Sequence, residues 1–262
     1  MTFYLRRMEE LSTDELAGNP RLAAQLILQA ARQGELEAQA LLGQILLDGQ
    51  GIQRDQPLAL VWFRIAAERG HAMARNMLGR CLEHGWGCAS NVTEAARHYR
   101  IAADAGLDWA MYNLANLHAT GRGVAKDETR AVALYQQAAV LGHAKSLNLL
   151  GRYYEEGMVV PQDIDLAYDC YRRSAEGGDF RGQFSHAAVL AGQGRLAEAE
   201  DWLRRALDEG NLNFLRVARS NLEASPHRPF RQLALDYYRR AAELGDDGDL
   251  QLLHEAAGRL VA

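Results

Sequence analysis

The chain has 262 residues, of which 48% are hydrophobic and 24% charged, and its formal net charge is −5 at pH 7. These values are typical of a folded soluble protein and argue against nucleic-acid binding, which needs a clustered basic surface. The apolar runs are too short for a membrane-spanning helix. The first residues carry Arg6, Arg7, Glu9 and Glu10 and no apolar core, so they do not resemble a secretory signal, and we expect a cytoplasmic protein.

A unit of about 36 residues recurs along the chain. Closing glycines stand 36 residues apart at positions 34, 70, 106, 142 and 178, and two more follow at looser spacing, at 210 and 245. In the same phase each unit repeats a Leu before a small residue, a Gly-x-Gly, an Asp or Asn, an aromatic residue and a small pair. A fixed period of this length indicates a repeat array, in which each unit packs against its neighbours.

We predict two helices per unit, joined by the Gly-x-Gly loop. A short helix at Phe3–Leu11 and a helix at Pro20–Gln33, which begins at the start signal Asn19-Pro20, come before the regular units. The first helices of four regular units are expected at Leu36–Leu47, Ala72–His84, Asp108–Ala119 and Ala144–Glu156. Their second helices are expected at Pro57–Arg69, Thr93–Ala105, Glu128–Leu141 and Ile164–Glu176.

Two divergent units and a closing helix follow. Their helices are expected at Arg181–Gly192, Arg195–Glu209, Asn211–Ala224, Phe230–Leu244 and Asp249–Leu260. We predict a single solenoid domain over residues 1–262. It divides into an N-terminal cap with a partial repeat (1–34), four regular repeats (35–178), two divergent repeats (179–245) and a C-terminal capping helix (246–262) that covers the last apolar face.

Local residue choices support these boundaries. The Asp or Asn at positions 55, 91, 127 and 163 is placed to cap the second helix, because its side chain can accept a bond from a free backbone N–H of the first turn. The loop glycines and the closing glycines are expected at positive φ. Glycine also recurs inside the first helices, at 43, 79 and 151, where it costs about 1 kcal/mol relative to alanine. We therefore predict close packing there against the small pairs of the second helices.

The repeated pattern A-x-x-x-L-G, G-x-G, Asp and A-x-x-W/Y-x-x-A-A-x-x-G resembles the Sel-one-like repeat (SLR) family, a relative of tetratricopeptide repeats. The resemblance extends from about Ala23 to Gly245, with departures at Ala115, His118 and Val159. It implies an all-α fold, a right-handed α-α superhelix of about six helix-turn-helix repeats. It also implies an adaptor or scaffold without enzymatic activity or cofactor. Some secreted members carry a cysteine pair in every repeat, which this chain does not.

In tetratricopeptide-like arrays the first helices line the inner surface, and this implies a set of partner-binding residues. The set is Asn76, Arg80, Trp109, Tyr112, Asn116, Lys145, Asn148 and Arg152. Equivalent positions in the earlier units are Glu37, Ala40, Gln44 and Met73. Asn amides can bond a peptide backbone, Arg can bind a carboxylate, and exposed aromatic residues are enriched at binding hot spots. The alternative is a solvated helix face with no binding role.

Two other functions stay open at this point. Cys81, His84, Cys88 and His98 resemble a zinc-binding or enzymatic quartet by residue type, but zinc requires all four side chains to converge. His98 stands where other units carry Trp, Leu or Cys, so it can equally be a packing variant. With three cysteines in the chain, we expect free thiols. The other possibility is a structural scaffold that associates with itself. The sequence shows no P-loop, nucleophile elbow or His-Glu-x-x-His motif.

Overall fold

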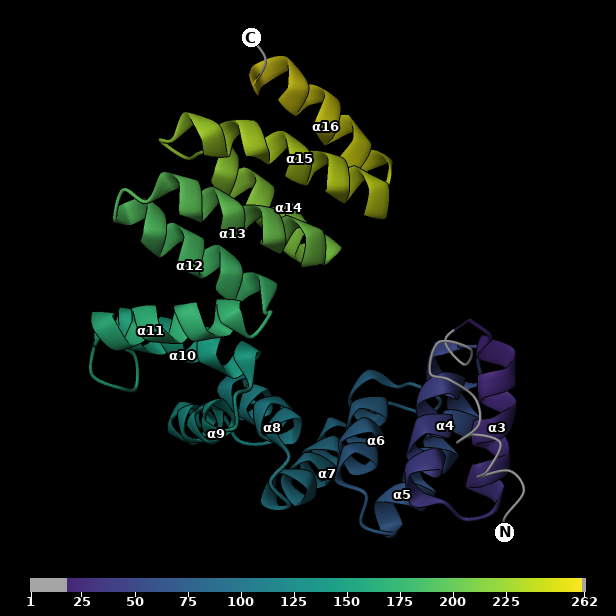
Figure 1. Ribbon diagram of the computed structural model, residues 1–262. Coiled ribbons are helices and arrows are strands. Elements are labelled where there is room, and N and C mark those ends of the chain that lie inside the picture. Colours follow the sequence, from purple (N-terminus) through teal and green to yellow (C-terminus); the bar gives the residue numbers. More distant parts are fainter. Residues whose placement is uncertain (1–17, 261–262) are drawn as a thin grey trace. The chain divides into compact units, whose positions relative to one another are not determined.

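The computed structural model describes residues 18–260, and within that range every regular element is an α-helix (Figure 1). The first helices of the repeats are α4 (Leu36–Asp48), α6 (Ala72–His84), α8 (Asp108–Thr120), α10 (Ala144–Glu156), α12 (Phe180–Gly192) and α14 (Leu212–Glu223). The second helices are α3 (Pro20–Arg32), α5 (Gln56–Glu68), α7 (Val92–Asp104), α9 (Glu128–Val140), α11 (Ile164–Glu176), α13 (Leu196–Glu209) and α15 (Arg228–Leu244), followed by α16 (Asp247–Leu260).

The all-α repeat fold is therefore confirmed, and every predicted helix in the described range ends within two residues of its expected bounds. The helix expected at Phe3–Leu11 lies outside the described residues. Helix α15 begins at Arg228, two residues earlier than expected. Pro229 is accommodated in its first turn, where the missing N–H would have had no helical partner in any case.

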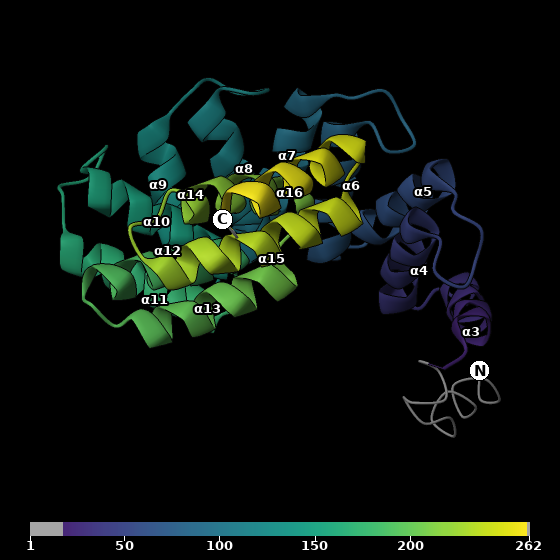
Figure 2. The same cartoon turned by 90° about the horizontal axis from the view of Figure 1, so that it is seen from above.

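The chain divides within α9 into two compact units, residues 1–138 and 139–262. Within each unit, successive helices pack as neighbouring antiparallel pairs (Figures 1 and 2). In the first unit the apolar core extends from α3 to α6 and contains the buried rings and methyl groups of Phe63, Leu42 and Leu78. In the second unit a separate core joins α12 to α15 around Leu203, Leu215 and Tyr237. Each unit thus buries its own apolar side chains.

Asp and Asn cap the second helices as predicted. The side-chain oxygens of Asp55, Asn91, Asp127 and Asp163 each accept a bond from the backbone N–H three residues later, at 2.8–3.0 Å. Each cap satisfies one of the donors that a helix leaves unpaired at its N-terminus. These four residues therefore set where the second helices start.

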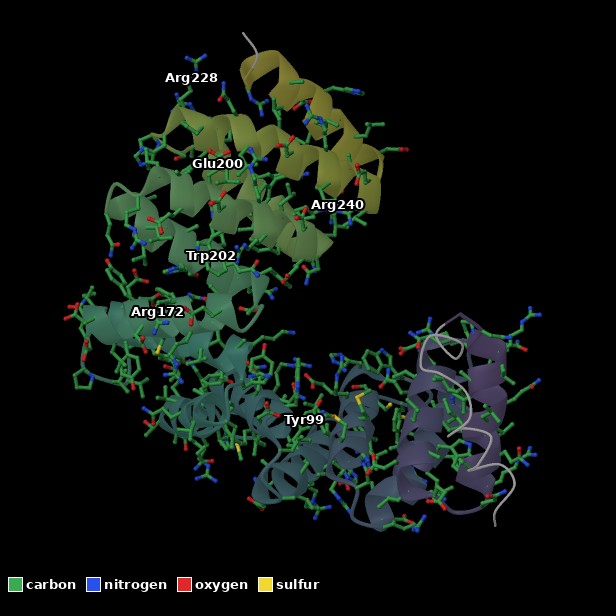
Figure 3. All side chains as sticks on the ribbon, in the orientation of Figure 1. Tyr99, Arg172, Glu200, Trp202, Arg228 and Arg240 are labelled. Carbon is green, nitrogen blue, oxygen red and sulfur yellow. The ribbon has the colours of Figure 1, made fainter. Side chains whose placement is uncertain are left out.

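The predicted close approach at the glycines inside the first helices is present, but the nearest groups are aromatic rings of the second helices and not the small pairs. A Cβ atom on Gly79 would lie 2.7 Å from the ring of Tyr99, one on Gly43 would lie 2.7 Å from the ring of Phe63, and one on Gly151 would lie 2.4 Å from the ring of Tyr171. In these three repeats the aromatic ring of the second helix occupies the space that a side chain would need, which accounts for glycine at positions 43, 79 and 151. The hydroxyl of Tyr99, which is labelled in Figure 3, donates to the Glu83 carboxylate at 2.7 Å.

The closing glycines divide into two groups. Those at 34, 70, 106, 142 and 178 have φ between 81° and 94°, as predicted for a helix C-terminus. Gly210 has φ −67° and Gly245 has φ −105°, so neither needs positive φ. Both are glycine for lack of space, because a Cβ atom would strike the Phe214 ring or the Asp249 carboxylate.

The loop between α10 and α11 contains a strained valine. Val159 has φ 66°, the value that the second loop glycine adopts in the three preceding repeats. A side chain at such φ costs about 1–2 kcal/mol, and glycine removes this cost. Glycine also adds conformational entropy to the unfolded chain, which offsets part of the gain, so we expect Val159→Gly to raise the free energy of unfolding by about 0.5–1 kcal/mol. Thermal unfolding of the two proteins measures this. Val160→Gly is the control and should destabilise, and a loss of stability in Val159→Gly would contradict the strain.

Candidate functional site on the first helices

Two of the predicted partner-binding residues are buried and join neighbouring repeats. The Asn76 amide oxygen accepts a bond from the Asn113 amide at 2.9 Å, and the Asn148 amide oxygen accepts one from the Ser185 hydroxyl at 3.0 Å. Only 2% of Asn76 and 5% of Asn148 are exposed. Each pair connects one first helix to the next within the same unit, so these amides satisfy buried polar groups between helices.

Asn116 also has a partner inside its repeat. Its amide oxygen accepts a bond from the Tyr135 hydroxyl at 2.6 Å. In the neighbouring repeats the equivalent tyrosines donate to carboxylates, Tyr99 to Glu83 and Tyr171 to Glu155. Burial, aided by the bonded carboxylate, raises the pKa of both hydroxyls far above the usual range of tyrosine. These tyrosines therefore stay protonated and act as donors at any physiological pH.

The predicted aromatic residues do lie at the surface of the first unit. Trp109 is 40% exposed and meets Tyr112 edge to face, with ring centroids 6.4 Å apart. Tyr112 in turn lies 6.2 Å from the ring of Tyr135. Edge-to-face contact is a favoured arrangement of aromatic rings, so Trp109 presents apolar area at the surface while packed against Tyr112.

The predicted cations divide between the two units. In the first unit the Arg80 guanidinium lies over the Trp86 ring, 5.1 Å from its centroid, and His84 stacks on the same ring at 4.8 Å. In the second unit Arg152 is exposed and pairs with Glu156 at 3.6 Å, and Lys145 is half-buried. Exposed ion pairs contribute little to stability, so Arg152 can change partners at small cost.

A cavity of about 500 Å³ opens on the surface of the first unit, between α3, α4 and α6. Its wall contains four of the residues at the predicted partner-facing positions, Glu37, Ala40, Gln44 and Met73. The rest of the wall is mostly apolar, from Ile27, Ala30, Leu41, Phe63 and Met77 among others. A cavity of this size with an apolar wall and a few polar groups is typical of ligand and peptide sites.

Sequence reasoning missed the part of this cavity that α3 and Leu41 contribute. Leu41 is 47% exposed although it directly precedes the buried Leu of the repeat motif. An apolar residue at that position is visible in the sequence, but its exposure depends on how α3 and α6 flank α4. Ile27 and Ala30 stand in the phase of Phe63 and Ala66 of the next repeat, and this is the signal that could have placed them on the same face.

Polar groups lie along one side of the cavity. His71 caps α6, because its Nδ1 accepts the N–H of Ala74 at 3.0 Å, and its Nε2–H therefore donates to the Glu37 carboxylate, also at 3.0 Å. Glu35 stands at the N-cap position of α4 but makes no capping bond. Both carboxylates are exposed, and neither has a Lys or Arg partner among the ion pairs of residues 18–260.

The cysteines and histidines do not assemble as a zinc quartet. Cys81 is fully buried, and Cys88 donates to the Cys81 backbone oxygen at 3.7 Å. His84 is exposed against Trp86, and His98 turns toward Glu94, 3.8 Å away. Across residues 18–260 no group of three or more His, Cys, Asp or Glu is placed to hold a metal ion. Burial raises the pKa of the Cys81 thiol to about 12, so it is a packed, unreactive side chain.

His98 gives the first unit a dependence on pH. Burial lowers its pKa below the ordinary value of about 6.5, so the unfolded chain takes up a proton more readily than the folded one. The contribution of neutral His98 to the free energy of unfolding is therefore complete above about pH 6.5. It is lost as the pH drops below that value, which gives the free energy of unfolding a slope against pH. We expect His98→Leu, which matches Leu134 of the next repeat, to reduce this slope by at most about 1.4 kcal/mol per pH unit. Urea unfolding between pH 5 and 8 measures it, and an unchanged slope would rule out a titrating His98.

Comparisons with known proteins agree with the repeat pattern. The family model described as Sel1 repeat matches residues 12–35, 36–71, 72–107, 110–143, 144–179 and 231–246. No curated protein matches the chain. Among residues 18–260, none of the helices has both the length and the apolar character needed to cross a membrane.

Several solved structures share the fold. A Sel1 repeat protein from Oxalobacter formigenes is 26% identical, with a TM-score of 0.64, over 86% of this chain and 87% of that one. A protective antigen of uropathogenic Escherichia coli with an SLR fold is 25% identical, with a TM-score of 0.63; the match covers 98% of this chain but 56% of that protein. An immunity protein from Pseudomonas aeruginosa is 15% identical, with a TM-score of 0.55, over 86% of this chain and 82% of that one, which shows a shared fold alone.

Proposed function

The chain belongs to the Sel1 repeat family, and on that premise we propose that it is an adaptor or scaffold that binds a segment of a protein partner on the surface of its first helices. Proteins of this family are generally interaction scaffolds and not enzymes. Because a fold by itself does not fix a function, the proposal depends on the surface of this chain. The observation that carries it is the cavity between α3, α4 and α6, whose wall includes four predicted partner-facing positions.

The wall of the cavity suits a protein segment. Met73 and Met77 line it, and flexible methionines adapt to varied apolar partners. Leu41 and Met73 are exposed large apolar side chains on neighbouring first helices, so a partner that covers them gains apolar burial. Trp109 and Tyr112 offer further contact area in the same unit, and Lys145 and Arg152 offer charged contacts in the second unit.

We place this activity in a reducing compartment, the cytoplasm. Cys81, Cys88 and Cys170 are all free thiols, and Cys170 is buried like Cys81. Free buried cysteines are common in proteins of reducing compartments, where disulfides are rare.

Polar substitution in the cavity tests the proposal. Leu41→Gln together with Met73→Gln should abolish capture of the partner from native cells, measured by quantitative mass spectrometry against the unaltered chain. Val61→Gln is the matched control, because Val61 is 46% exposed on the second helix α5 and does not line the cavity. All three side chains are exposed, so we expect unchanged thermal unfolding. If the double variant captures the same proteins in the same amounts, the proposal is wrong. Trp109→Ala, examined in the same way, tests the aromatic contact.

A further inference from the structure

The charges around the cavity between α3, α4 and α6 indicate which side chains a partner segment needs. We infer that the occupant is an amphipathic segment, with apolar side chains on one face and Lys or Arg beside them, that docks over Leu41 and Met73. This inference rests on the proposed function and adds the chemistry of the partner. It follows from three features of the cavity: the hydrogen bonding and exposure of the Glu37 carboxylate, the position of Glu35, and the exposure of the apolar wall.

Within residues 18–260 the Glu37 carboxylate forms no ion pair with a Lys or Arg. It accepts a bond from His71 Nε2–H at 3.0 Å, while His71 Nδ1 accepts the N–H of Ala74. A ring that accepts at one nitrogen and donates at the other is the neutral tautomer. The imidazole therefore orients Glu37 without neutralising it, and the Glu37 side chain stays 89% exposed toward solvent.

Glu35 places a second exposed carboxylate on the cavity wall, and it has no Lys or Arg partner in the part of the chain that the structure describes. It occupies the N-cap position of α4, where Ser, Thr, Asp or Asn would accept a bond from the first turn, but its side chain makes none. It lines the same cavity as Glu37 and is exposed. Both carboxylates therefore face an approaching partner, and a cation beside them would be attracted.

The apolar wall between these charges fits a helix face. Leu41 lies on α4 and Met73 on α6, both more than a third exposed, with Ile27 and Met77 deeper in the wall. Apolar side chains spaced on one face of a helix can occupy such a cavity, as in other helix-in-groove complexes. The occupant thus combines apolar anchors with a neighbouring Lys or Arg.

Three probe peptides test the inference on the full chain by fluorescence anisotropy. One is an amphipathic helix of Leu and Lys, the second has Glu in place of Lys, and the third scrambles the first so that its leucines share no face. We expect the Leu-Lys helix to bind at least tenfold more tightly than the other two. Glu35→Gln with Glu37→Gln should weaken it about three- to tenfold and reduce its salt dependence. Leu41→Gln with Met73→Gln should abolish binding, and Val61→Gln should leave it unchanged.

The outcomes separate this inference from the proposed function. Equal affinity for the Lys and Glu peptides, or no effect of the double Glu→Gln substitution, overturns the choice of a basic partner but leaves a partner site in the cavity. If the Leu41 and Met73 variant loses neither the peptide nor the cellular partner, both proposals fall. A molecular mass in solution that drops in that variant would show that a second copy of the chain occupies the cavity, which also overturns the inference.

Discussion

Gly87→Ala is expected to lower the free energy of unfolding by about 2–5 kcal/mol. Two costs contribute. Gly87 has φ 75°, where a side chain costs about 1–2 kcal/mol. A Cβ atom at this position would also lie 2.4 Å from the backbone oxygen of Gln56, at the start of α5 in the preceding repeat. Forcing backbone apart in a packed structure costs about 1–3 kcal/mol more.

Gly106→Ala is the matched control for Gly87→Ala. Gly106 has φ 87°, and a Cβ atom there would meet nothing within 4 Å. It therefore carries the cost of positive φ alone, about 1–2 kcal/mol. Urea unfolding of both variants, followed by far-ultraviolet circular dichroism, gives the difference. If the two variants lose equal stability, close approach at Gly87 plays no part in joining the repeats.

The two variants separate the two reasons for glycine in the Gly-x-Gly loops, positive φ and close approach to neighbouring backbone. The first loop glycine of a repeat, such as Gly85, lies against its own loop, but the second lies against the preceding repeat: Gly51 on Pro20, Gly87 on Gln56 and Gly123 on Val92. From the sequence alone only the positive φ is predictable. The close approach between repeats depends on where the preceding helix begins, and we therefore expect the second glycine to be the less replaceable one.

Helix positions were predictable because their signals are local. In the regular repeats an Asp or Asn before the second helix and a glycine after it act on backbone groups three or four residues away, and these local signals placed the helix bounds to within two residues. The environment of the first helices was less predictable, because it depends on residues one repeat away. Burial of Asn76 is tolerated because Asn113 donates to its amide oxygen, and burial of Asn148 because Ser185 does.

The sequence does contain a signal for the burial of Asn76 and Asn148, because each is followed 37 residues later by another polar residue. Position 37 after a first-helix residue lies on the next first helix, so two polar residues at that spacing can satisfy each other. At the corresponding positions of α4 and α6, Ala40 precedes Met77, and this combination cannot form such a bond. The open cavity at Ala40 occurs where this polar link is missing.

Asp249→Leu is expected to destabilise the second unit by about 3–5 kcal/mol, because it leaves a buried arginine without its partner. The Asp249 carboxylate accepts bonds from Arg219 Nη1 at 2.8 Å and Arg216 Nη2 at 2.6 Å, both from α14. Asp249 is 2% exposed, and the Arg219 side chain 6%. These bonds attach the closing helix α16 to α14, and α16 also packs on α15. The loss should appear as a lower midpoint in urea unfolding of the full chain.

A double-substitution cycle isolates this ion pair. Arg219→Met with Asp249→Leu removes both buried charges, so we expect it to lose less stability than Asp249→Leu alone. Asp247→Asn, at an exposed position in the first turn of α16, is the surface control and should change stability by less than about 0.5 kcal/mol. If the double variant is less stable than Asp249→Leu, charge burial is not the cause of the loss.

The same carboxylate predicts how the second unit responds to acid. The bonds from Arg216, then those from Arg219, lower the pKa of Asp249 to about 2. In the unfolded chain an Asp titrates near 3.9, so the folded state holds its proton less readily. The contribution of Asp249 is therefore complete above about pH 4 and is lost as the pH falls through 2. Unfolding measured between pH 2 and 5 should show a slope that Asp249→Asn reduces. A slope equal to that of the unaltered chain would mean that the Asp249 carboxylate titrates normally and that the packing of α16 on α15 holds the helix in place.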